Sequence, residues 1–114
     1  MRLIFAAALA AACLFTSPAG AAAALSGNSY LDFCGRKDRT ICEFYTVGVV
    51  DGIIATRFLD PAAAQICIPE RATTPQLVAV ATDFVRGAPK YRHYDALQLL
   101  AVAYKEAFPC EGFK

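Results

Sequence analysis

The chain has 114 residues, of which 57% are hydrophobic and 18% are charged, so it is predicted to fold rather than stay disordered. Eleven basic against ten acidic residues give a formal charge of +1, which argues against capture of nucleic acid or anionic lipid by a positive field. A single histidine leaves few ways to assemble the side-chain pairs of an active site. We therefore expect a non-enzymatic protein without a cofactor.

The first 24 residues have the pattern of a secretory signal peptide. Arg2 precedes an apolar stretch over residues 3–15, which is too short to cross a bilayer. Ser17-Pro18 and a run of small residues follow this stretch. Three alanines are candidate cleavage sites: Ala21, Ala23 and Ala24.

Two other interpretations of this leader remain open, namely an uncleaved membrane anchor and lipid attachment at Cys13. Removal of residues 1–24 leaves a single domain of residues 25–114, with ten basic and ten acidic side chains. We expect this domain to be periplasmic and not to insert stably into the membrane. A domain of this size buries only roughly 60–65% of its unfolded surface, so covalent cross-links are expected.

Two helices are predicted in the first half of this domain. A short one covers residues 28–34 and is stopped by Gly35. The second runs from Ile41 to Leu59, because Thr40 to Glu43 has the pattern of a capping box and Asp60-Pro61 disfavours continuation. The expected apolar face of the second helix has six members: Phe44, Tyr45, Val47, Ile54, Phe58 and Leu59.

Two glycines, Gly48 and Gly52, lie four residues apart in the second helix. Their missing side chains are expected to let another helix of the same molecule approach closely. The β-branched run Val47–Val50 is also compatible with a strand, but the capping box before it favours the helix.

A third helix begins at Thr73 or Thr74, with Pro75 in its first turn, and ends at Gly87 and Pro89. Its predicted apolar face contains five residues: Leu77, Ala81, Phe84, Val85 and Ala88.

A fourth helix is predicted from Tyr94 to Phe108, where Pro109 ends it. Its predicted apolar face also contains five residues: Leu97, Leu100, Ala101, Tyr104 and Phe108. No convincing alternating pattern of a strand occurs in the sequence. The expected fold class is therefore all-α, a small disulfide-linked bundle of about four helices.

Four cysteines remain after removal of the leader, and an even number in an exported chain predicts two disulfides. They are Cys34, Cys42, Cys67 and Cys110. No Cys-x-x-Cys motif is present, so a metal site is the less favoured alternative. Short connections place successive helices side by side and antiparallel, which favours Cys34–Cys42 and Cys67–Cys110 among the three possible pairings.

Six sequence elements occur in the order that is seen in the Rap/Tai immunity family: Leu31-Asp32-Phe33-Cys34, Cys42-Glu43-Phe44-Tyr45-Thr46-Val47-Gly48, Asp51-Gly52, Cys67-Ile68-Pro69, Thr74-Pro75-Gln76-Leu77 and Ala107-Phe108-Pro109-Cys110. The chain resembles this family over nearly its whole mature part. The resemblance implies a periplasmic helical protein, commonly dimeric, that binds and blocks a toxin injected by a type VI secretion system. In the best-known members that toxin is a peptidoglycan amidase.

The resemblance also implies that a loop between the third and fourth helices enters the catalytic cleft of the toxin. The corresponding stretch is residues 87–93, and the candidate partner-binding residues are Pro89, Lys90, Tyr91, Arg92 and His93. This stretch groups two cations, an aromatic ring and an imidazole, and tyrosine and arginine are frequent anchors of protein interfaces. An ordinary solvated turn is the alternative.

Two further functions remain open at this point, a small acid-stress chaperone of the periplasm and an accessory structural protein of the envelope. No catalytic residue is predicted. Asp51 is expected to form a surface or interface salt bridge, His93 to be partly exposed at a helix start, and Tyr45 to bury its ring with the hydroxyl at the rim.

Overall fold

The computed structural model describes residues 24–110 of the chain. Its elements are α1 (Gly27–Cys34), α2 (Thr40–Leu59), the 3₁₀ helix η1 (Pro61–Ala63), α3 (Thr74–Gly87), the 3₁₀ helix η2 (Pro89–Tyr91) and α4 (Ala96–Ala107). Over residues 24–110 there is no β-strand, only two isolated bridges. The prediction of an all-α fold is therefore confirmed. The expected leader, Cys13 included, lies outside the described residues apart from Ala24.

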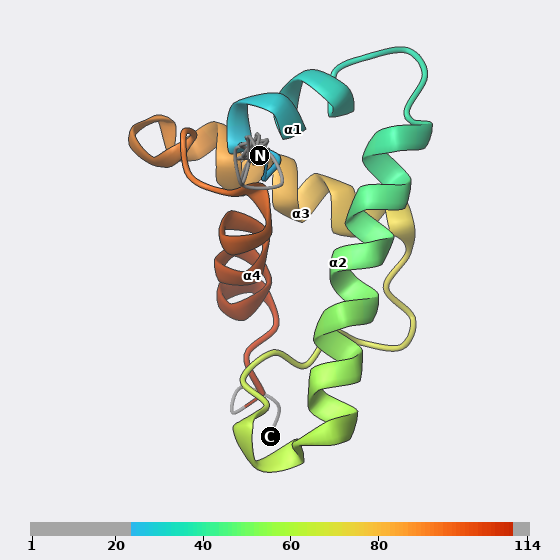
Figure 1. The fold of residues 1–114 in the computed structure, drawn as a ribbon. Helices are drawn as coiled ribbons and strands as arrows, with labels where there is room; N and C mark the ends of the chain where they lie inside the picture. Colours follow the sequence, from blue (N-terminus) through green and yellow to red (C-terminus); the bar gives the residue numbers. More distant parts are fainter. Residues whose placement is uncertain (1–23, 111–114) are drawn as a thin grey trace, which may run out of the picture.

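Helix α3 lies in the middle of the molecule and contacts the other three α-helices. In Figure 1, α1 lies over α3, while α2 and α4 extend downward from it on opposite sides. The largest fully buried side chains come from all four α-helices: Tyr30, Cys42, Thr46, Val78, Val85, Leu100 and Tyr104. The core is thus a single cluster around α3.

Helix α1 ends as the sequence predicts and begins close to the predicted position. The Ser26 hydroxyl accepts a hydrogen bond of 3.2 Å from the backbone amide of Ser29, which caps the first turn. At the other end, the amide of Gly35 donates to the carbonyl of Leu31. The helix begins one residue earlier than the sequence pattern indicates, at Gly27.

The start of α2 differs from the predicted capping box. The cap position is Arg39, which makes no side-chain cap, and Thr40 is already inside the helix. The carboxylate of Asp38 accepts a hydrogen bond of 3.0 Å from the amide of Thr40. The prediction of a capping box is therefore wrong, because the carboxylate of Asp38, two residues before Thr40, already accepts from a free amide of the first turn.

The predicted apolar face of α2 is also wrong. The buried residues of this helix are Cys42, Thr46, Val49 and Val50. Four of the predicted members are exposed by half or more, with exposed fractions of 74% for Phe44, 51% for Ile54, 84% for Phe58 and 81% for Leu59. The disulfide from Cys42 to Cys34 turns one side of α2 toward α1, and the residues one turn further along follow it into the core.

The two glycines of α2 do not serve packing within the chain. A Cβ atom added at Gly48 or at Gly52 meets no atom within 4 Å. The expectation that another helix of the same molecule approaches at these glycines is therefore wrong, and both glycines face outward.

Helix α3 follows the sequence prediction closely. The Thr73 hydroxyl accepts a hydrogen bond of 3.3 Å from the amide of Gln76, so Thr73 rather than Thr74 is the cap. Three of the predicted core positions are buried, and Phe84 is partly buried. The buried face as the structure shows it is Leu77, Val78, Ala81, Thr82 and Val85.

Helix α4 begins two residues later than predicted. Tyr94 lies outside the helix because its carbonyl accepts a hydrogen bond from the amide of Gly27, and Asp95 pairs with Ser26 in an isolated bridge. Leu97, a predicted core residue, is 55% exposed. The residues buried within this helix are Ala96, Leu99, Leu100, Ala103 and Tyr104.

Both predicted disulfides are confirmed, with Cα–Cα distances of 5.0 Å for Cys34–Cys42 and 4.8 Å for Cys67–Cys110. The arrangement of helices that brings Cys67 and Cys110 together differs from the predicted one. In Figure 1, α4 runs crosswise to α3 rather than antiparallel to it. The extended link before α3 passes the end of α4, where the amide of Cys67 donates to the carbonyl of Phe108 at 2.8 Å.

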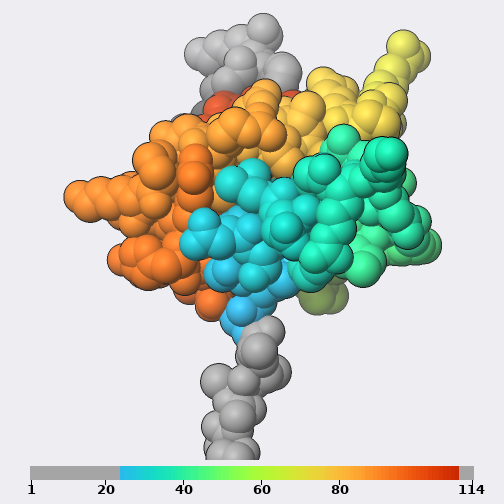
Figure 2. Space-filling model, turned by 90° about the horizontal axis from the view of Figure 1, so that it is seen from above, coloured from blue at the N-terminus to red at the C-terminus, as the bar shows by residue number. Residues whose placement is uncertain are grey.

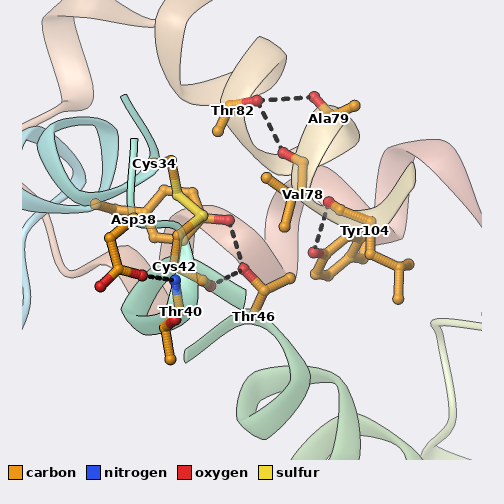
Figure 3. Close-up of a disulfide and its surroundings, with 11 residues drawn as sticks. Cys34, Asp38, Thr40, Cys42, Thr46, Val78, Ala79, Thr82 and Tyr104 are labelled. Carbon is orange, nitrogen blue, oxygen red and sulfur yellow. Dashed lines mark hydrogen bonds between the residues drawn. A yellow bond between two sulfur atoms is a disulfide. The ribbon is translucent and has the colours of Figure 1, made fainter. Parts of the chain in front are cut away.

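A buried hydrogen-bond chain lies beside the first disulfide (Figure 3). The Thr46 hydroxyl donates to the carbonyl of Cys42 at 2.7 Å and accepts from the hydroxyl of Tyr30 at 2.7 Å. Within residues 24–110, every buried side-chain nitrogen or oxygen has a hydrogen-bond partner. Burial raises the pKa of the Tyr30 hydroxyl, so the folded protein keeps this donor protonated further into the alkaline range.

Candidate functional site

The link between α3 and α4, residues 88–95, forms the candidate site and is called the 88–95 loop below. It contains η2 and all five predicted partner-binding residues. Figure 2 shows the end of α3 and this loop, both orange, at one end of the molecular surface. The loop is therefore placed where a partner protein can reach it.

The 88–95 loop is a compact turn rather than an extended strand. Pro89 fixes the backbone at the first position of η2. The amide of Tyr91 then donates to the carbonyl of Ala88 at 3.0 Å, and the amide of Tyr94 donates to the carbonyl of Tyr91 at 2.9 Å. Lys90, Tyr91 and His93 are exposed on these turns, whereas Arg92 is partly buried.

Arg92 holds the loop against the end of α3. Its Nε donates to the carbonyl of Val85 at 3.1 Å, and its Nη2 donates to the carbonyl of Arg86. A cation is favourable here because the last carbonyls of a helix carry partial negative charge and lack partners within the helix. The structure thus directs two of the guanidinium donors into the protein, and α3 ends at Gly87 without any residue of positive φ.

The other predicted residues form an exposed aromatic cluster. The rings of Tyr91 and Tyr94 are stacked, with centroids 5.8 Å apart, and are 45% and 48% exposed. The ring of His93 lies 4.5 Å from that of Tyr94, and Nζ of Lys90 lies 5.7 Å from the Tyr91 ring. Such a cluster offers flat apolar surface, hydroxyl groups and a cation to a partner.

A groove of about 400 Å³ continues the aromatic cluster along α3 and α4. Tyr91 and Tyr94 form one side of it, and its walls include Phe84 and Val102 from the two helices. The sequence prediction missed Tyr94, because the helical pattern placed this residue inside the fourth helix. A tyrosine pair three residues apart, next to Pro89, was the available signal.

The other residues that the sequence singled out do not gather at this loop. Asp51 is exposed on α2, and Tyr45 is partly buried between α2 and α4. Burial, followed by the nearby charge of Asp95, raises the pKa of the Tyr45 hydroxyl. Within residues 24–110 no group of three or more potential metal-ligating side chains occurs, and no helix there is long and apolar enough to span a membrane.

The fold and the site together define a small all-helical scaffold that is held by two disulfides and presents a fixed aromatic loop at one end. The sequence profile of the family described as Rap1a immunity proteins matches residues 6–110. The chain therefore belongs to this family of immunity proteins, which confirms the resemblance seen in its sequence motifs. No curated protein and no solved structure matches the chain.

Proposed function

We propose that this chain is a periplasmic immunity protein that binds a toxin delivered by a type VI secretion system and blocks its active site without catalysing a reaction itself. Membership of the Rap1a immunity proteins supports the class. The observation that carries the mechanism is the 88–95 loop, whose aromatic side chains are exposed while its backbone is held by Arg92. A protruding element of fixed shape blocks a cleft by occupying it, which requires no chemistry.

The proposed target is a peptidoglycan amidase, as the family resemblance implies. Peptidoglycan lies in the compartment to which residues 1–24 are proposed to direct the chain as a signal peptide, leaving 25–114 as the mature domain. The two disulfides support this location, because they persist in an oxidising compartment.

The five predicted partner-binding residues are proposed to act in two ways. Lys90, Tyr91 and His93 contact the toxin directly, because their side chains point outward from η2 and the residues after it. Pro89 and Arg92 fix the backbone that carries them. Tyr94 joins the contact surface through its stacked ring.

A homodimer through the exposed face of α2 is also proposed. This face, called the α2 stripe, carries residues at spacings of one to four: Ile41, Phe44, Tyr45, Gly48, Gly52, Ala55, Thr56 and Leu59. None of these residues is charged, and the stripe borders a groove of about 600 Å³ that Leu97 of α4 also lines. An apolar surface of this length on a 20-residue helix is typical of a protein interface.

The order of residues in the α2 stripe favours a second copy of this chain as the occupant. If two copies of α2 run antiparallel with their midpoints at Val50, Gly48 lies opposite Gly52 of the second copy. Large residues then face small ones, since Phe44 and Tyr45 lie opposite Thr56 and Ala55. The apolar ends, Ile41 and Leu59, meet each other. A two-fold dimer requires such self-complementarity, and facing glycines allow close approach of the two helices.

The test of the proposed function begins with the genes beside the one for this chain, one of which is expected to encode a secreted toxin. Directed to the periplasm of a bacterial host, this toxin is expected to lyse cells, and co-expression of the chain is expected to protect them. Tyr91→Ala is expected to weaken binding about thirtyfold, the effect of losing an interface hot spot. Phe58→Ala removes another exposed ring, on α2, and is the control.

Binding is measured by titration calorimetry with the purified toxin. Equal affinities of the Tyr91→Ala variant and the unchanged chain would overturn the role of the loop. Lysis of cells that contain the unchanged chain in their periplasm would overturn the proposed function itself.

A further inference from the structure

The first residues of the mature domain lie along the 88–95 loop. The amide of Gly27 donates to the carbonyl of Tyr94 at 3.0 Å, and the amide of Asn28 donates to the carbonyl of Arg92 at 2.9 Å. In the opposite direction, the amide of Ala96 donates to the carbonyl of Leu25 at 2.6 Å. Residues 25–28, called the N-terminal strap below, therefore make two backbone hydrogen bonds with the end of the loop and a third with Ala96, the first residue of α4.

The contact is so close that a side chain at position 27 would force its neighbours to move. A Cβ atom on Gly27 would lie 3.0 Å from the carbonyl oxygen of Arg92 and 3.2 Å from its Cα atom. It would also lie 2.5 Å from Cδ1 of Leu99, a side chain in the core. Among residues 24–110 no glycine has a positive φ, so Gly27 is required here for space rather than for an unusual backbone conformation.

Arg92 is thereby held from two directions. The N-terminal strap binds its backbone carbonyl, while its guanidinium binds the carbonyls of Val85 and Arg86 at the end of α3. The residues on either side of it in sequence, Tyr91 and His93, carry the exposed rings. A residue that is fixed in both backbone and side chain sets the direction of its two neighbours.

We propose that Gly27 is a positioning residue of the 88–95 loop, and that the N-terminal strap orders this loop before the toxin binds. This inference rests on the proposed function. A loop that is already ordered in the free protein loses less conformational entropy on binding, so the strap increases affinity without touching the toxin. Each candidate cleavage site of the leader, after Ala21, Ala23 or Ala24, leaves the whole strap in the mature chain.

The experiment measures hydrogen exchange at single amides by NMR in the mature chain and in Gly27→Ala. Exchange is expected to become at least about tenfold faster at Ala96 and at Asn28 in the variant, because the added methyl group separates the strap from the loop. Amides in the middle of α3 are expected to exchange as before. Phe58→Ala is the control, since this side chain is 84% exposed near the end of α2 and belongs neither to the strap nor to the α2 stripe.

A second variant covers the case in which Gly27→Ala disturbs the core through Leu99. A mature chain that begins at Gly27 lacks Leu25 and Ser26, so it loses the acceptor of the Ala96 amide without adding any volume. Faster exchange at Ala96 in this shortened chain supports the strap. Unchanged exchange at Ala96 in both variants would overturn the proposal that the N-terminal strap orders the loop.

Affinity for the neighbouring toxin separates the two proposals. Faster exchange together with binding about tenfold weaker in Gly27→Ala supports the positioning role. Faster exchange with unchanged affinity would overturn that role. If the toxin binds neither the variant nor the unchanged chain, the proposed function fails, whereas the exchange rates still decide whether the strap orders the loop.

Discussion

The hydroxyl of Tyr104 donates a hydrogen bond of 2.9 Å to the carbonyl oxygen of Leu77, which joins the last turns of α4 to the first turns of α3. Both side chains are buried, and α3 and α4 form the frame that carries the 88–95 loop. Tyr104→Phe is expected to lower the free energy of unfolding by about 1 kcal/mol, the net value of one such bond. Urea unfolding followed by circular dichroism measures this change, and an unaltered midpoint would contradict it.

The same buried hydroxyls make the protein sensitive to alkaline pH. Burial raises the pKa of Tyr104 and Tyr30 above their ordinary value of 10.0. Above pH 10 the unfolded chain releases these protons while the folded chain retains them, so the free energy of unfolding falls as pH rises. Their stabilising effect is complete below about pH 10, and each hydroxyl contributes a slope of up to about 1.4 kcal/mol per pH unit.

Unfolding in urea between pH 9 and pH 12 checks this dependence. Tyr104→Phe is expected to reduce the slope, because one of the tyrosines whose pKa is raised by burial is gone. Tyr91→Phe is the control, since the ring of Tyr91 is 45% exposed in the folded protein. A slope that is equal in all three proteins would count against buried tyrosine as its cause.

The hydrogen-bond chain beside Cys42 predicts unequal effects of two conservative changes. Thr46→Val leaves the buried Tyr30 hydroxyl without its acceptor and is expected to lower the free energy of unfolding by about 2 kcal/mol. Tyr30→Phe removes the donor but leaves the Thr46 hydroxyl bonded to the carbonyl of Cys42. This change is expected to lower the free energy of unfolding by only about 1 kcal/mol.

The double variant of Tyr30 and Thr46 completes this cycle. It is expected to be more stable than the sum of the two single changes predicts, because no buried hydroxyl is left unpaired. Thermal unfolding of the four proteins measures the coupling, and strictly additive effects would mean that the two hydroxyls act independently.

The two disulfides are expected to contribute unequally to stability. Cys67–Cys110 spans 43 positions and Cys34–Cys42 spans 8. In the loop-entropy model, loss of Cys67–Cys110 lowers the free energy of unfolding by about 4 kcal/mol and loss of Cys34–Cys42 lowers it by about 2.5 kcal/mol. Paired Cys→Ala replacements, compared by urea unfolding, test this order, and a larger loss for the shorter loop would contradict the model.

The α2 stripe predicts a variant that blocks dimer formation without harming the fold. Gly48→Leu adds a side chain whose Cβ atom meets nothing within 4 Å and also favours the helix, so the monomer is expected to remain stable. In an antiparallel dimer the same side chain separates the two helices. Sedimentation equilibrium is expected to show a dimer for the unchanged chain and a monomer for this variant.

Gly87→Leu is the matched control for the dimer, because Gly87 is equally open but lies at the end of α3, away from the stripe. It is expected to remain dimeric. A monomeric unchanged chain would overturn the proposed dimer, and a dimeric Gly48→Leu variant would place its interface elsewhere.

The ends of the helices were largely readable from the sequence, because local groups determine them. Thr73 caps α3 with its own hydroxyl, and Gly35 ends α1 as predicted. The start of α2 shows the limit of such reasoning. Two carboxylates, Asp38 and Glu43, are candidates to accept from the amide of Thr40, and the sequence pattern alone did not reveal that Asp38 does so.

The buried faces of α2 and α4 were less predictable. Helical spacing identifies a set of apolar residues but not the rotation of the helix, and α2 has apolar residues on most sides. The exposed Phe44 and Leu97 were therefore taken as core, while the buried Thr46, a polar residue, was not. In the candidate site, the pattern predicted the exposed Tyr91 and His93 but not the inward-directed bonds of Arg92.

By itself the sequence determined the helical class, the number of disulfides and the family, because capping groups, proline positions and the cysteine count act over short distances or by simple counting. The pairing Cys67–Cys110 was predicted correctly, but from an antiparallel arrangement of α3 and α4 that the structure does not have (Figure 1). Only the tertiary structure decided which faces of the helices are buried and that residues 25–28 lie against the 88–95 loop. The reason is physical: these features depend on contacts between different elements of the fold, such as Tyr30 with Thr46 and Gly27 with Tyr94, and no local pattern encodes which elements meet.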